Sequence, residues 1–434
     1  MDLAPDTLVP APSTSGSGRP SIIERAGQAL VGAQARMARE AGLYPFGYVL
    51  SHPSASCYPG EGKQQVINFG SSNYLGLSTH PTVVEAAQDA ARKFGTSAAG
   101  PRLFNGTLAL HLELEEELAD FYGKQAAAVF PSGFAANVAM LSSLLTRHDA
   151  AIFDRHSHVS QREGAERNRI PALTFRHNEP ESLRRRLAGL SPSTGFAVCL
   201  DGVFSMDGSI APLRQIAEIT KSYGGSLFVD EAHSLGVVGA TGRGASEHHD
   251  CLADVDLISV SLSKALAGTG GAVIGDRDAV EHISLTARSY IFTASCDPSA
   301  VGAVLAALRI LRARPELAAA ARASGQRVRQ IVADAGWDAI AGQTPIVCIP
   351  ARNRISAVLA WRSLIDAGVY VNVAVPPAVP EHGCLLRIVA SAAHSESDFD
   401  RLYQALCAAR QKFRVAHDYG GLREQRNLGS KATK

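Results

Sequence analysis

Short apolar runs alternate with longer amphipathic segments from residue 82 onward. One helix is predicted to start at Pro81, and two more are predicted at 108–122 and 134–145, where apolar residues recur at helical spacing. The runs that predict strands are 126–130, 150–154, 172–175, 196–201, 226–233, 255–261 and 271–275. Alternation of this kind favours a mainly parallel sheet that is covered by helices on both faces.

The pattern changes after two predicted helices at 299–312 and 315–336. Strand-like pieces follow, with further helices between and after them, at 346–349, 357–367, 369–373, 385–389 and 397–409. We therefore expect a large domain over 71–314 and a smaller C-terminal α+β domain over 315–415. A helix at 22–41 and short strands are expected to occupy residues 22–70.

The two ends of the chain differ in composition from the rest. Residues 1–21 are rich in Pro, Ser, Gly and Thr and lack an apolar signal segment, so we expect a disordered tail. Residues 416–434 are expected to form a flexible tail. No stretch approaches the roughly 18 apolar residues that a membrane span needs. The apolar and aromatic segment 42–48 either packs on the core or gives a weak association with a membrane surface.

The composition is that of an ordinary globular protein, with 434 residues, 46% hydrophobic and 19% charged, and a formal net charge of +1. Such a chain is long enough for two domains with a sizeable core. Its near-neutral charge gives no electrostatic reason to expect a nucleic-acid partner. The seven cysteines are scattered without Cys-x-x-Cys spacing, so we expect reduced thiols in the cytoplasm and neither a disulfide frame nor a metal site.

The most informative residues stand at the ends of two predicted strands. Lys264 follows one strand, and Asp230 and His233 end the other. Enzymes that use pyridoxal 5'-phosphate (PLP) hold it through a lysine imine and place an acidic group at the ring nitrogen. We therefore expect Lys264 to bind PLP as a Schiff base, Asp230 to pair with the pyridinium nitrogen, and His233 to bond the ring hydroxyl. The alternative is a solvated loop lysine and a helix-capping aspartate.

Other segments supply further parts of such a site. The turn 132–134 joins a strand to a helix, where exposed N–H groups suit a phosphate, although such a turn is also a routine helix cap. His158 follows another strand and would stack on the PLP ring, with His156 as a competitor for this place. Ser205, in the turn after 196–201, would bond the ring hydroxyl.

The order and spacing of these parts resemble those of the α-oxoamine synthases, a family of fold type I PLP enzymes. The resemblance covers roughly residues 42–406. It implies an α/β fold with a large, mainly parallel, seven-stranded sheet domain and a smaller C-terminal α+β domain. The shared motifs are Asn73-Tyr74-Leu75-Gly76-Leu77, Arg102 and Asn105-Gly106-Thr107 with His111-x-x-Leu114-Glu115, Ser132-Gly133-Phe134, Val203-Phe204-Ser205-Met206-Asp207-Gly208, Val229-Asp230-Glu231-Ala232-His233, Gly242-Arg243-Gly244, Ser263-Lys264 and Ile291-Phe292-Thr293-Ala294-Ser295.

The resemblance also implies roles for individual residues. Those implied in catalysis are Lys264, His158, Asp230 and His233, with the freed amine of Lys264 as the base. Those implied to bind the cofactor are Ser132, Gly133, Phe134, His158, Ser205, Asp230, His233, Ser261, Lys264 and Thr293. Those implied to bind substrate are Asn73, Arg387 and Ser391.

Two of these roles carry structural expectations. Arg387 is expected to clamp the substrate carboxylate, with a surface salt bridge as the alternative. Thr293, together with Ser295, is expected to reach the phosphate of a partner subunit. The protein is therefore expected to be an obligate homodimer with the active site at the subunit interface.

Several stretches are most similar to bacterial serine palmitoyltransferases, among them Phe175-Arg176-His177-Asn178. The implied reaction condenses an amino acid with an acyl thioester and releases CO2 and a thiol, giving an α-aminoketone. Segment 42–47 lacks the basic residues usual in the biotin-pathway branch, which argues against a short dicarboxylic acyl substrate. Asp201, where the palmitoyltransferase branch commonly has glutamate, and Cys296-Asp297 are departures that leave the exact substrate open.

Alternatives remain at this point. One is 8-amino-7-oxononanoate synthase or aminoketobutyrate ligase activity, and another is a different PLP reaction, such as aminotransfer or retro-aldol cleavage. A third is a non-enzymatic scaffold subunit, against which the intact cofactor residues argue. The sequence does not determine the amino acid (Ser, Ala or Gly), the acyl chain length, or whether the thiol is coenzyme A or an acyl-carrier protein.

Overall fold

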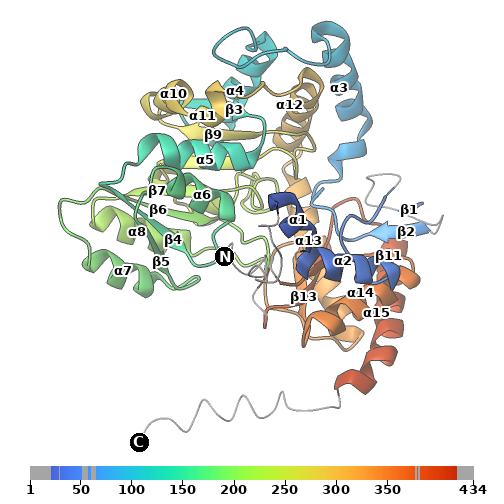
Figure 1. Ribbon diagram of the computed structural model, residues 1–434. Coiled ribbons are helices and arrows are strands. Elements are labelled where there is room, and N and C mark those ends of the chain that lie inside the picture. The colour runs from blue at the N-terminus through green and yellow to red at the C-terminus, as the bar shows by residue number, and fades with distance from the viewer. Residues whose placement is uncertain are drawn as a thin grey trace, which may run out of the picture.

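The computed structural model describes residues 21–28, 30–50, 57–59, 65–376, 379 and 382–417. This part of the chain forms a large domain on a seven-stranded sheet and a smaller domain on two three-stranded sheets (Figure 1). The predicted tails over 1–21 and 416–434 lie almost wholly outside the described residues.

The large sheet has the strand order β3-β9-β8-β7-β6-β4-β5. β4 to β8 are parallel, whereas β9 runs antiparallel to both β3 and β8. β3 therefore points the same way as the parallel strands, and the carboxyl ends of all strands except β9 lie at one edge. The strands are β3 (Ala126–Phe130), β4 (Ala150–Asp154), β5 (Ala172–Phe175), β6 (Phe196–Asp201), β7 (Ser226–Asp230), β8 (Leu257–Ser261) and β9 (Gly271–Gly275).

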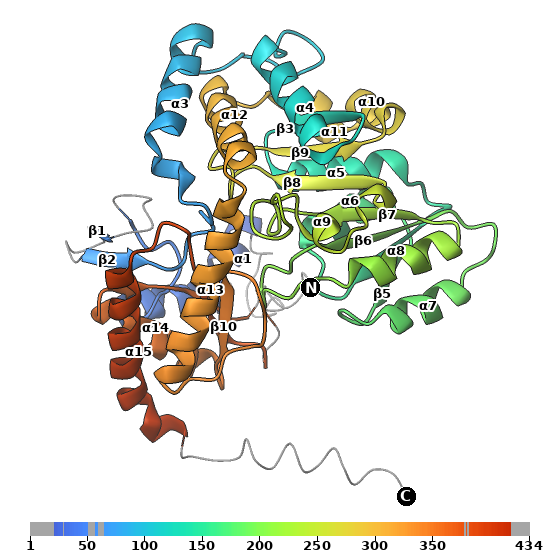
Figure 2. The same cartoon turned by 180° about the vertical axis from the view of Figure 1, so that it is seen from behind.

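Neighbouring residues of a strand enter two different hydrophobic cores. In β4, Ile152 packs in the core that includes α7, α8 and α12, whereas Phe153 packs in the core that includes α5 and α10. α5 and α6 lie toward the viewer in Figure 1, and α8 lies toward the viewer in Figure 2. Because side chains alternate between faces, a strand in a sheet covered on both sides is apolar along its length. The helices of this domain are α3 (Pro81–Phe94), α4 (Ala109–Tyr122), α5 (Gly133–Leu144), α6 (Val159–Arg167), α7 (Pro180–Ala188), α8 (Leu213–Ser222), α9 (Ala245–His248), α10 (Arg277–Thr286), α11 (Arg288–Ile291) and α12 (Pro298–Ala313).

The smaller domain contains segments from both ends of the chain. An antiparallel sheet has the order β10-β13-β12, and a second sheet joins β2 from the N-terminal region to β1 and, in parallel, to β11. Ile67 and Phe69 share a core with Trp361 of α14. Figure 2 shows α12 and α13 running one after the other from the large domain into the small one. The elements are β1 (Cys57–Pro59), β2 (Gln65–Asn68), α13 (Glu316–Asp334), β10 (Ile346–Pro350), α14 (Arg354–Asp366), β11 (Val369–Tyr370), β12 (Asn372–Ala374), β13 (Leu385–Val389) and α15 (Glu396–His417).

The structure refines the predictions at three places. The strand predicted at 369–373 is divided, because β11 pairs with β2 while β12 pairs with β13 in the other sheet. The helix predicted at 22–41 corresponds to α1 (Ile22–Gln28) and α2 (Leu30–Glu40). Within segment 42–48, Tyr48 stacks on Tyr370 at 5.5 Å and therefore packs on the small domain, whereas Phe46 stays exposed.

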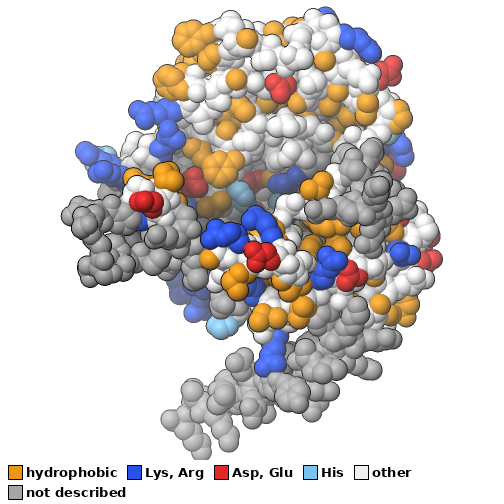
Figure 3. All heavy atoms as spheres, turned by 45° about the vertical axis from the view of Figure 1, so that its right-hand side comes forward, with side chains coloured by type: hydrophobic (Ala, Val, Ile, Leu, Met, Phe, Trp, Pro, Cys, Tyr) orange, Lys and Arg blue, Asp and Glu red, His pale blue; other side chains and the backbone are white. Residues whose placement is uncertain are grey.

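The surface carries mixed charge. On the face shown in Figure 3, Lys and Arg side chains are interspersed with acidic and apolar ones. This mixture is in keeping with the formal net charge of +1. None of the helices in the described part of the chain has the length and apolar character that crossing a membrane requires.

Candidate active site

The predicted cofactor residues converge at the carboxyl edge of the large sheet. Asp230 ends β7 and Ser261 ends β8, while His233 and Lys264 lie in the turns that follow these two strands. His158 lies after β4, at the start of α6. Ligands of open α/β sheets bind at this edge, because loops from several strands meet there.

Asp230 is a buried carboxylate held by neutral donors. It is 7% exposed, and Nδ2 of Asn137 donates to its Oδ2 across 2.6 Å. The backbone N–H of Ala232 donates to its Oδ1 across 2.9 Å. The amide of Asn137 is fixed in turn by Ser160 at 2.9 Å and Ser259 at 2.6 Å. No cation of the described chain forms a salt bridge with Asp230. A buried charge requires a partner, and a protonated ring nitrogen would supply one.

His233 is oriented by a hydroxyl from a distant part of the sequence. Oη of Tyr74 lies 2.7 Å from its Nδ1, and the two rings meet edge to face at 6.2 Å. Burial lowers the pKa of His233 well below its ordinary value, and the charges of Lys264 and Arg387 add to this effect. The imidazole is therefore neutral. When Tyr74 donates to Nδ1, Nε2 carries the proton and can donate it to a ring hydroxyl oxygen.

Lys264 has the character of a nucleophilic amine. Its ammonium has neither a hydrogen bond nor an ion pair with any residue that the structure describes. Burial lowers its pKa, and the charge of Arg387 adds to this, while Asp230 and Asp201 act in the opposite direction. A lowered pKa increases the fraction of neutral amine, which is the form that attacks a carbonyl group or accepts a proton.

The amino end of α5 lies directly on β8 and β9. Ser132 caps this helix by accepting a hydrogen bond at Oγ from the N–H of Ala135 across 3.1 Å. A Cβ on Gly271 would come within 2.4 Å of the backbone nitrogen of Gly133, so this close approach requires glycine. A Cβ on Gly133 would in turn lie 3.0 Å from Cβ of Ser261. The free N–H groups of the first turn and the helix dipole favour a phosphate here.

His158 lies beside Phe134 at the open side of the site. The two rings meet edge to face at 6.4 Å. Nδ1 of His158 lies 2.7 Å from Oγ of Ser160, which fixes the ring. Loss of water contacts lowers the pKa of His158, so the ring is suited to stacking in its neutral form. His156, the competitor, instead stacks on His177, with the ring centroids 4.0 Å apart.

Asp201 lies beneath these residues, in register with Asp230 on the neighbouring strand. It accepts hydrogen bonds at Oδ1 from the backbone of His158 at 3.1 Å and from Nε2 of Gln161 at 2.9 Å. Burial raises the pKa of Asp201 well above its ordinary value, and the charge of Asp230 adds to this. The raised pKa favours the protonated form of Asp201, whose carboxyl group holds His158 through these hydrogen bonds.

Arg387 reaches the site from β13 of the small domain. It is 8% exposed, and its Nε donates to the backbone carbonyl of Ser205 across 2.6 Å. Within the described chain it forms no salt bridge with a carboxylate. Its charge lowers the pKa values of both His233 and Lys264, so the guanidinium acts on the same part of the site. The buried guanidinium is thus available for the carboxylate of a substrate.

Asn73 and Ser391 hold each other and their own loops. Oγ of Ser391 donates to the carbonyl of Asn73 across 2.8 Å, and Nδ2 of Asn73 donates to Ser78 across 2.7 Å. Both residues are buried. These bonds fix the turn that presents Tyr74 to His233. Direct contact of either residue with substrate stays a prediction.

Thr293 lies just after α11, between exposed Phe292 and buried Ser295. The N–H and Oγ of Ser295 both donate to the carbonyl of Gly100, at 3.1 and 3.2 Å. These bonds tie the loop 292–297 to the loop 96–107. The contact of Thr293 with a partner's phosphate stays a prediction.

The donors and acceptors of this site fit PLP. The cofactor has a ring nitrogen, a hydroxyl, an aldehyde and a phosphate. The carboxylate of Asp230 suits the ring nitrogen, and the neutral imidazole of His233 suits the hydroxyl. The amine of Lys264 suits the aldehyde, and the amino end of α5 suits the phosphate. Each polar group of the cofactor therefore has a suitable partner.

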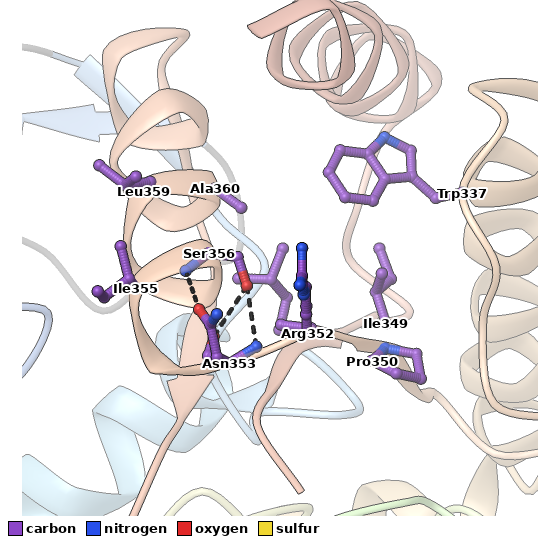
Figure 4. A pocket seen from close by; sticks show the side chains of 11 residues that line it. Trp337, Ile349, Pro350, Arg352, Asn353, Ile355, Ser356, Leu359 and Ala360 are labelled. Carbon is purple, nitrogen blue, oxygen red and sulfur yellow. Dashed lines mark hydrogen bonds between the residues drawn. The ribbon is translucent and has the colours of Figure 1, made fainter. Parts of the chain in front are cut away.

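A separate cavity lies in the small domain. It has a volume of about 210 Å³ and is lined by Trp337 and Ile349 and, from α14, by Ile355 and Leu359 (Figure 4). None of the residues assigned above to cofactor or substrate lines this cavity. It is therefore not part of the active site.

Known proteins match this chain over most of its length. The sequence profile described as Aminotransferase class I and II matches residues 64–406. A serine palmitoyltransferase of Caulobacter vibrioides is 39% identical over 335 residues, which are 77% of this chain and 83% of that protein. An 8-amino-7-oxononanoate synthase of Geobacter sulfurreducens is 38% identical over 371 residues, 85% of this chain and 94% of that protein. A solved serine palmitoyltransferase structure that contains PLP has a TM-score of 0.85 and 32% identity, covering 89% of this chain and 98% of that chain.

The fold, the site and these matches define the class: the chain belongs to the aminotransferase class I and II family, whose fold type I members depend on PLP. Within that class it is an α-oxoamine synthase, a PLP-dependent acyltransferase, because the relatives that cover most of its length are enzymes of that kind.

Two residues of the site received no role from the sequence. Asn137 is the only polar residue in the apolar run 134–141, a signal that a buried amide serves a specific partner. Tyr74 stands within the motif 73–77, but its partner lies 159 positions away. Local patterns indicate that both residues matter without indicating what they contact.

Proposed function

We propose that this enzyme condenses an amino acid, with serine as the leading candidate, with a long-chain acyl thioester. The products are an α-aminoketone, CO2 and a free thiol. The observation that carries this proposal is Arg387, a buried cation without a described carboxylate partner that bonds the carbonyl of Ser205 and whose charge acts on the Lys264 amine. That arrangement would hold an amino acid with its α-carbon next to a base. The 39% identity to a serine palmitoyltransferase supports serine and a long acyl chain.

The protein's own groups supply binding and proton transfer. Bound PLP acts as the electron sink for the carbanion at the substrate α-carbon. Asp230 stabilises positive charge at the ring nitrogen by the opposite-charge effect on its pKa. Nζ of Lys264 accepts the α-proton, because its lowered pKa keeps it neutral more often than an exposed lysine.

Reaction specificity rests on orientation. Arg387 would bind the substrate carboxylate, while His158 and Phe134 border the site on the side of α5 and α6. A carboxylate held in this way is positioned for loss as CO2 once the acyl group has been added. Aminotransfer needs the same groups, so the fate of the carboxylate distinguishes the two reactions.

A second candidate is 8-amino-7-oxononanoate synthase activity, which the 38% identity to such an enzyme favours. Its acyl substrate ends in a carboxylate and would need a cation at the acyl pocket. Segment 42–47 offers no basic residue. We therefore rank a long, uncharged acyl chain first, carried by coenzyme A or by an acyl-carrier protein.

The enzyme is proposed to act as a homodimer in the cytoplasm. The two loops joined through Ser295 and Gly100 expose Phe292 and Phe104, which are 78% and 77% accessible. Exposed aromatic side chains on joined loops are typical of a surface that a partner covers. A dimer formed there would bring Thr293 toward the phosphate of the other subunit. A weak contact with a membrane surface through exposed Phe46 is part of the same proposal.

The test is a substrate matrix. Purified holoenzyme is mixed with serine, alanine or glycine and with palmitoyl-coenzyme A, palmitoyl-carrier protein or pimeloyl-coenzyme A. Free thiol is measured, and the products are identified by mass spectrometry. We expect thiol release only with both substrates present, with serine and a palmitoyl thioester giving the highest kcat/KM. Transfer of the amino group without thiol release would contradict the proposal, and a preference for alanine with pimeloyl-coenzyme A would establish the second candidate instead.

A further inference from the structure

A second cluster of chemically reactive side chains lies beside the active site. His156 follows β4, His177 follows β5, and Asp207 lies in the turn after β6. One potential ligand atom of each residue lies within 4.8 Å of those of the other two. None of the three has a role in the reaction derived above.

The spacing within the cluster is that of ligands around a small metal ion. Oδ2 of Asp207 lies 3.4 Å from Nδ1 of His156 and 3.3 Å from Nε2 of His177. Both separations are longer than a good N–H···O hydrogen bond. Bonds of about 2.0–2.1 Å in tetrahedral geometry place neighbouring ligand atoms about 3.3–3.4 Å apart. The three atoms could thus bind one ion with little movement of Asp207.

A carboxylate behind the cluster orients one of the ligands. Nδ1 of His177 lies 2.9 Å from Oδ1 of Asp154, which is fully buried at the end of β4. A histidine that donates its other N–H to a carboxylate is typical of metal sites, because the hydrogen bond sets the tautomer and increases the basicity of the ligand. Nε2 of His177 is therefore the nitrogen left for an ion, and it lies 3.1 Å from Oγ of Ser209, a further oxygen that an ion could take as a ligand.

A fourth ligand position is open. His156 is 49% exposed, so water can reach the cluster. Oδ1 of Asn178 is buried and has no described hydrogen-bond partner, while Nδ2 of the same amide lies 3.2 Å from Nε2 of His177. Rotation of this amide by half a turn would bring Oδ1 to the position of Nδ2, next to Nε2 of His177. Two imidazoles, a carboxylate and an oxygen form a donor set that suits Zn²⁺.

Two features of the cluster oppose metal binding and therefore limit the affinity for an ion. The rings of His156 and His177 stack at 4.0 Å with an angle of 21°, so one ring must tilt to direct its lone pair at a shared ion. His156 has the room to tilt because half of it is exposed. Burial disfavours the charged form of His177, but hydrogen bonds to Asp154 and Asp207 raise its pKa to about 9. A metal ion must therefore displace a proton, which lowers the affinity near neutral pH.

We propose that His156, His177 and Asp207 form a binding site for a divalent transition-metal ion of the Zn²⁺ type. The site lies two residues from His158, so an ion there would fix the loop that carries the residue expected to stack on the cofactor.

The test measures Zn²⁺ binding to the holoenzyme after treatment with a chelator. Isothermal titration calorimetry is performed on the wild type, on His156→Asn, and on the matched control His148→Asn, which changes an exposed histidine outside the cluster. We expect one ion per chain with micromolar affinity. Loss of one ligand should weaken binding at least about 10-fold in His156→Asn, and His148→Asn should bind like the wild type.

Two controls keep the result decisive. Thermal unfolding and the absorbance of bound cofactor show that each variant is folded and loaded. Anomalous diffraction at the zinc edge of soaked crystals locates the ion. The absence of saturable binding to the wild type, equal affinity of the wild type and His156→Asn, or an ion located elsewhere would each overturn the proposal.

Discussion

Nδ2 of Asn137 donates to Oδ2 of Asp230 across 2.6 Å, which joins the second turn of α5 to the end of β7. The same helix presents its amino end to the expected phosphate position. The first turn of α5 would therefore contact the phosphate directly, while Asn137 would act on the ring nitrogen at the other end of the cofactor through Asp230. Movement of α5 would disturb both ends together.

Asn137→Ala should lower both stability and cofactor retention. It removes a donor from a buried carboxylate and leaves Ser259 without its acceptor, at a cost of about 1–3 kcal/mol in the free energy of unfolding. Unfolding in urea and loss of PLP absorbance on dilution would measure these effects. Asn168→Ala, which removes an exposed amide bonded to the carbonyl of Ser142, is the control and should retain the cofactor fully. Equal behaviour of the two variants would contradict the role of Asn137.

Lys264→Ala should abolish turnover while leaving the fold intact. The change removes the amine that holds the cofactor and accepts the α-proton, and loss of the base alone costs about 10²–10⁴-fold in rate. Because Lys264 has no described polar partner, the free energy of unfolding should change by less than about 1 kcal/mol. Lys93→Ala, on the exposed surface of α3, is the matched control. Substantial thiol release by Lys264→Ala with added PLP would refute the assignment.

Tyr74→Phe should slow the reaction without preventing PLP binding. It deletes the hydroxyl that holds Nδ1 of His233 and frees the imidazole to change its tautomer. We expect kcat to fall about 10-fold, a loss comparable to one hydrogen bond. Tyr122→Phe is the control, because the buried Tyr122 hydroxyl has no described hydrogen-bond partner. That variant should keep wild-type kinetics and stability, and a similar loss in both variants would indicate a general packing effect.

The stability of the cofactor-free protein should depend on His233 at mildly acidic pH. Burial lowers the pKa of His233 in the folded state, so below its ordinary value of 6.5 the unfolded state binds more protons. The free energy of unfolding therefore keeps its full value, as far as His233 is concerned, above pH 6.5. It decreases as the pH falls toward the pKa of His233 in the folded state, by at most about 1.4 kcal/mol per pH unit. Thermal unfolding of the wild type and of His233→Gln between pH 8 and pH 5.5 would reveal a steeper decline for the wild type. Parallel curves would show that His233 does not titrate in this way.

The sequence predicted much of the large domain because its strands are covered on both faces. The runs 126–130, 196–201 and 271–275 match β3, β6 and β9. Once the strands before Asp230 and Lys264 were expected to be parallel, as β7 and β8 are, their polar ends had to meet at one edge, which brought Lys264, Asp230 and His233 together. Local periodicity and a general rule for open sheets were sufficient for this step.

Contacts between segments that are distant in the sequence could not be predicted from local periodicity. β2 pairs with β11 across about 300 positions, and this pairing divides the apolar run at 369–373 between two sheets. The bond between Tyr74 and His233 likewise depends on how the domains pack. Periodicity reports the face that a residue presents, but it does not report the partner that covers this face.

The last prediction concerns the subunit interface. Thr293 lies beside exposed Phe292, on a loop expected to reach the other subunit's cofactor. If it does, chains with Lys264→Ala and chains with Thr293→Ala should complement each other, because one of the two sites in a mixed dimer carries neither change. Random association makes half of the dimers mixed, so activity should approach about one quarter of the wild type. Co-expression with two affinity tags isolates the mixed dimer, in which activity should approach about half. Each parent variant is assayed alone as the baseline, and mixed dimers that do no better than this baseline, or a fully active monomer in light scattering, would disprove the contact in trans.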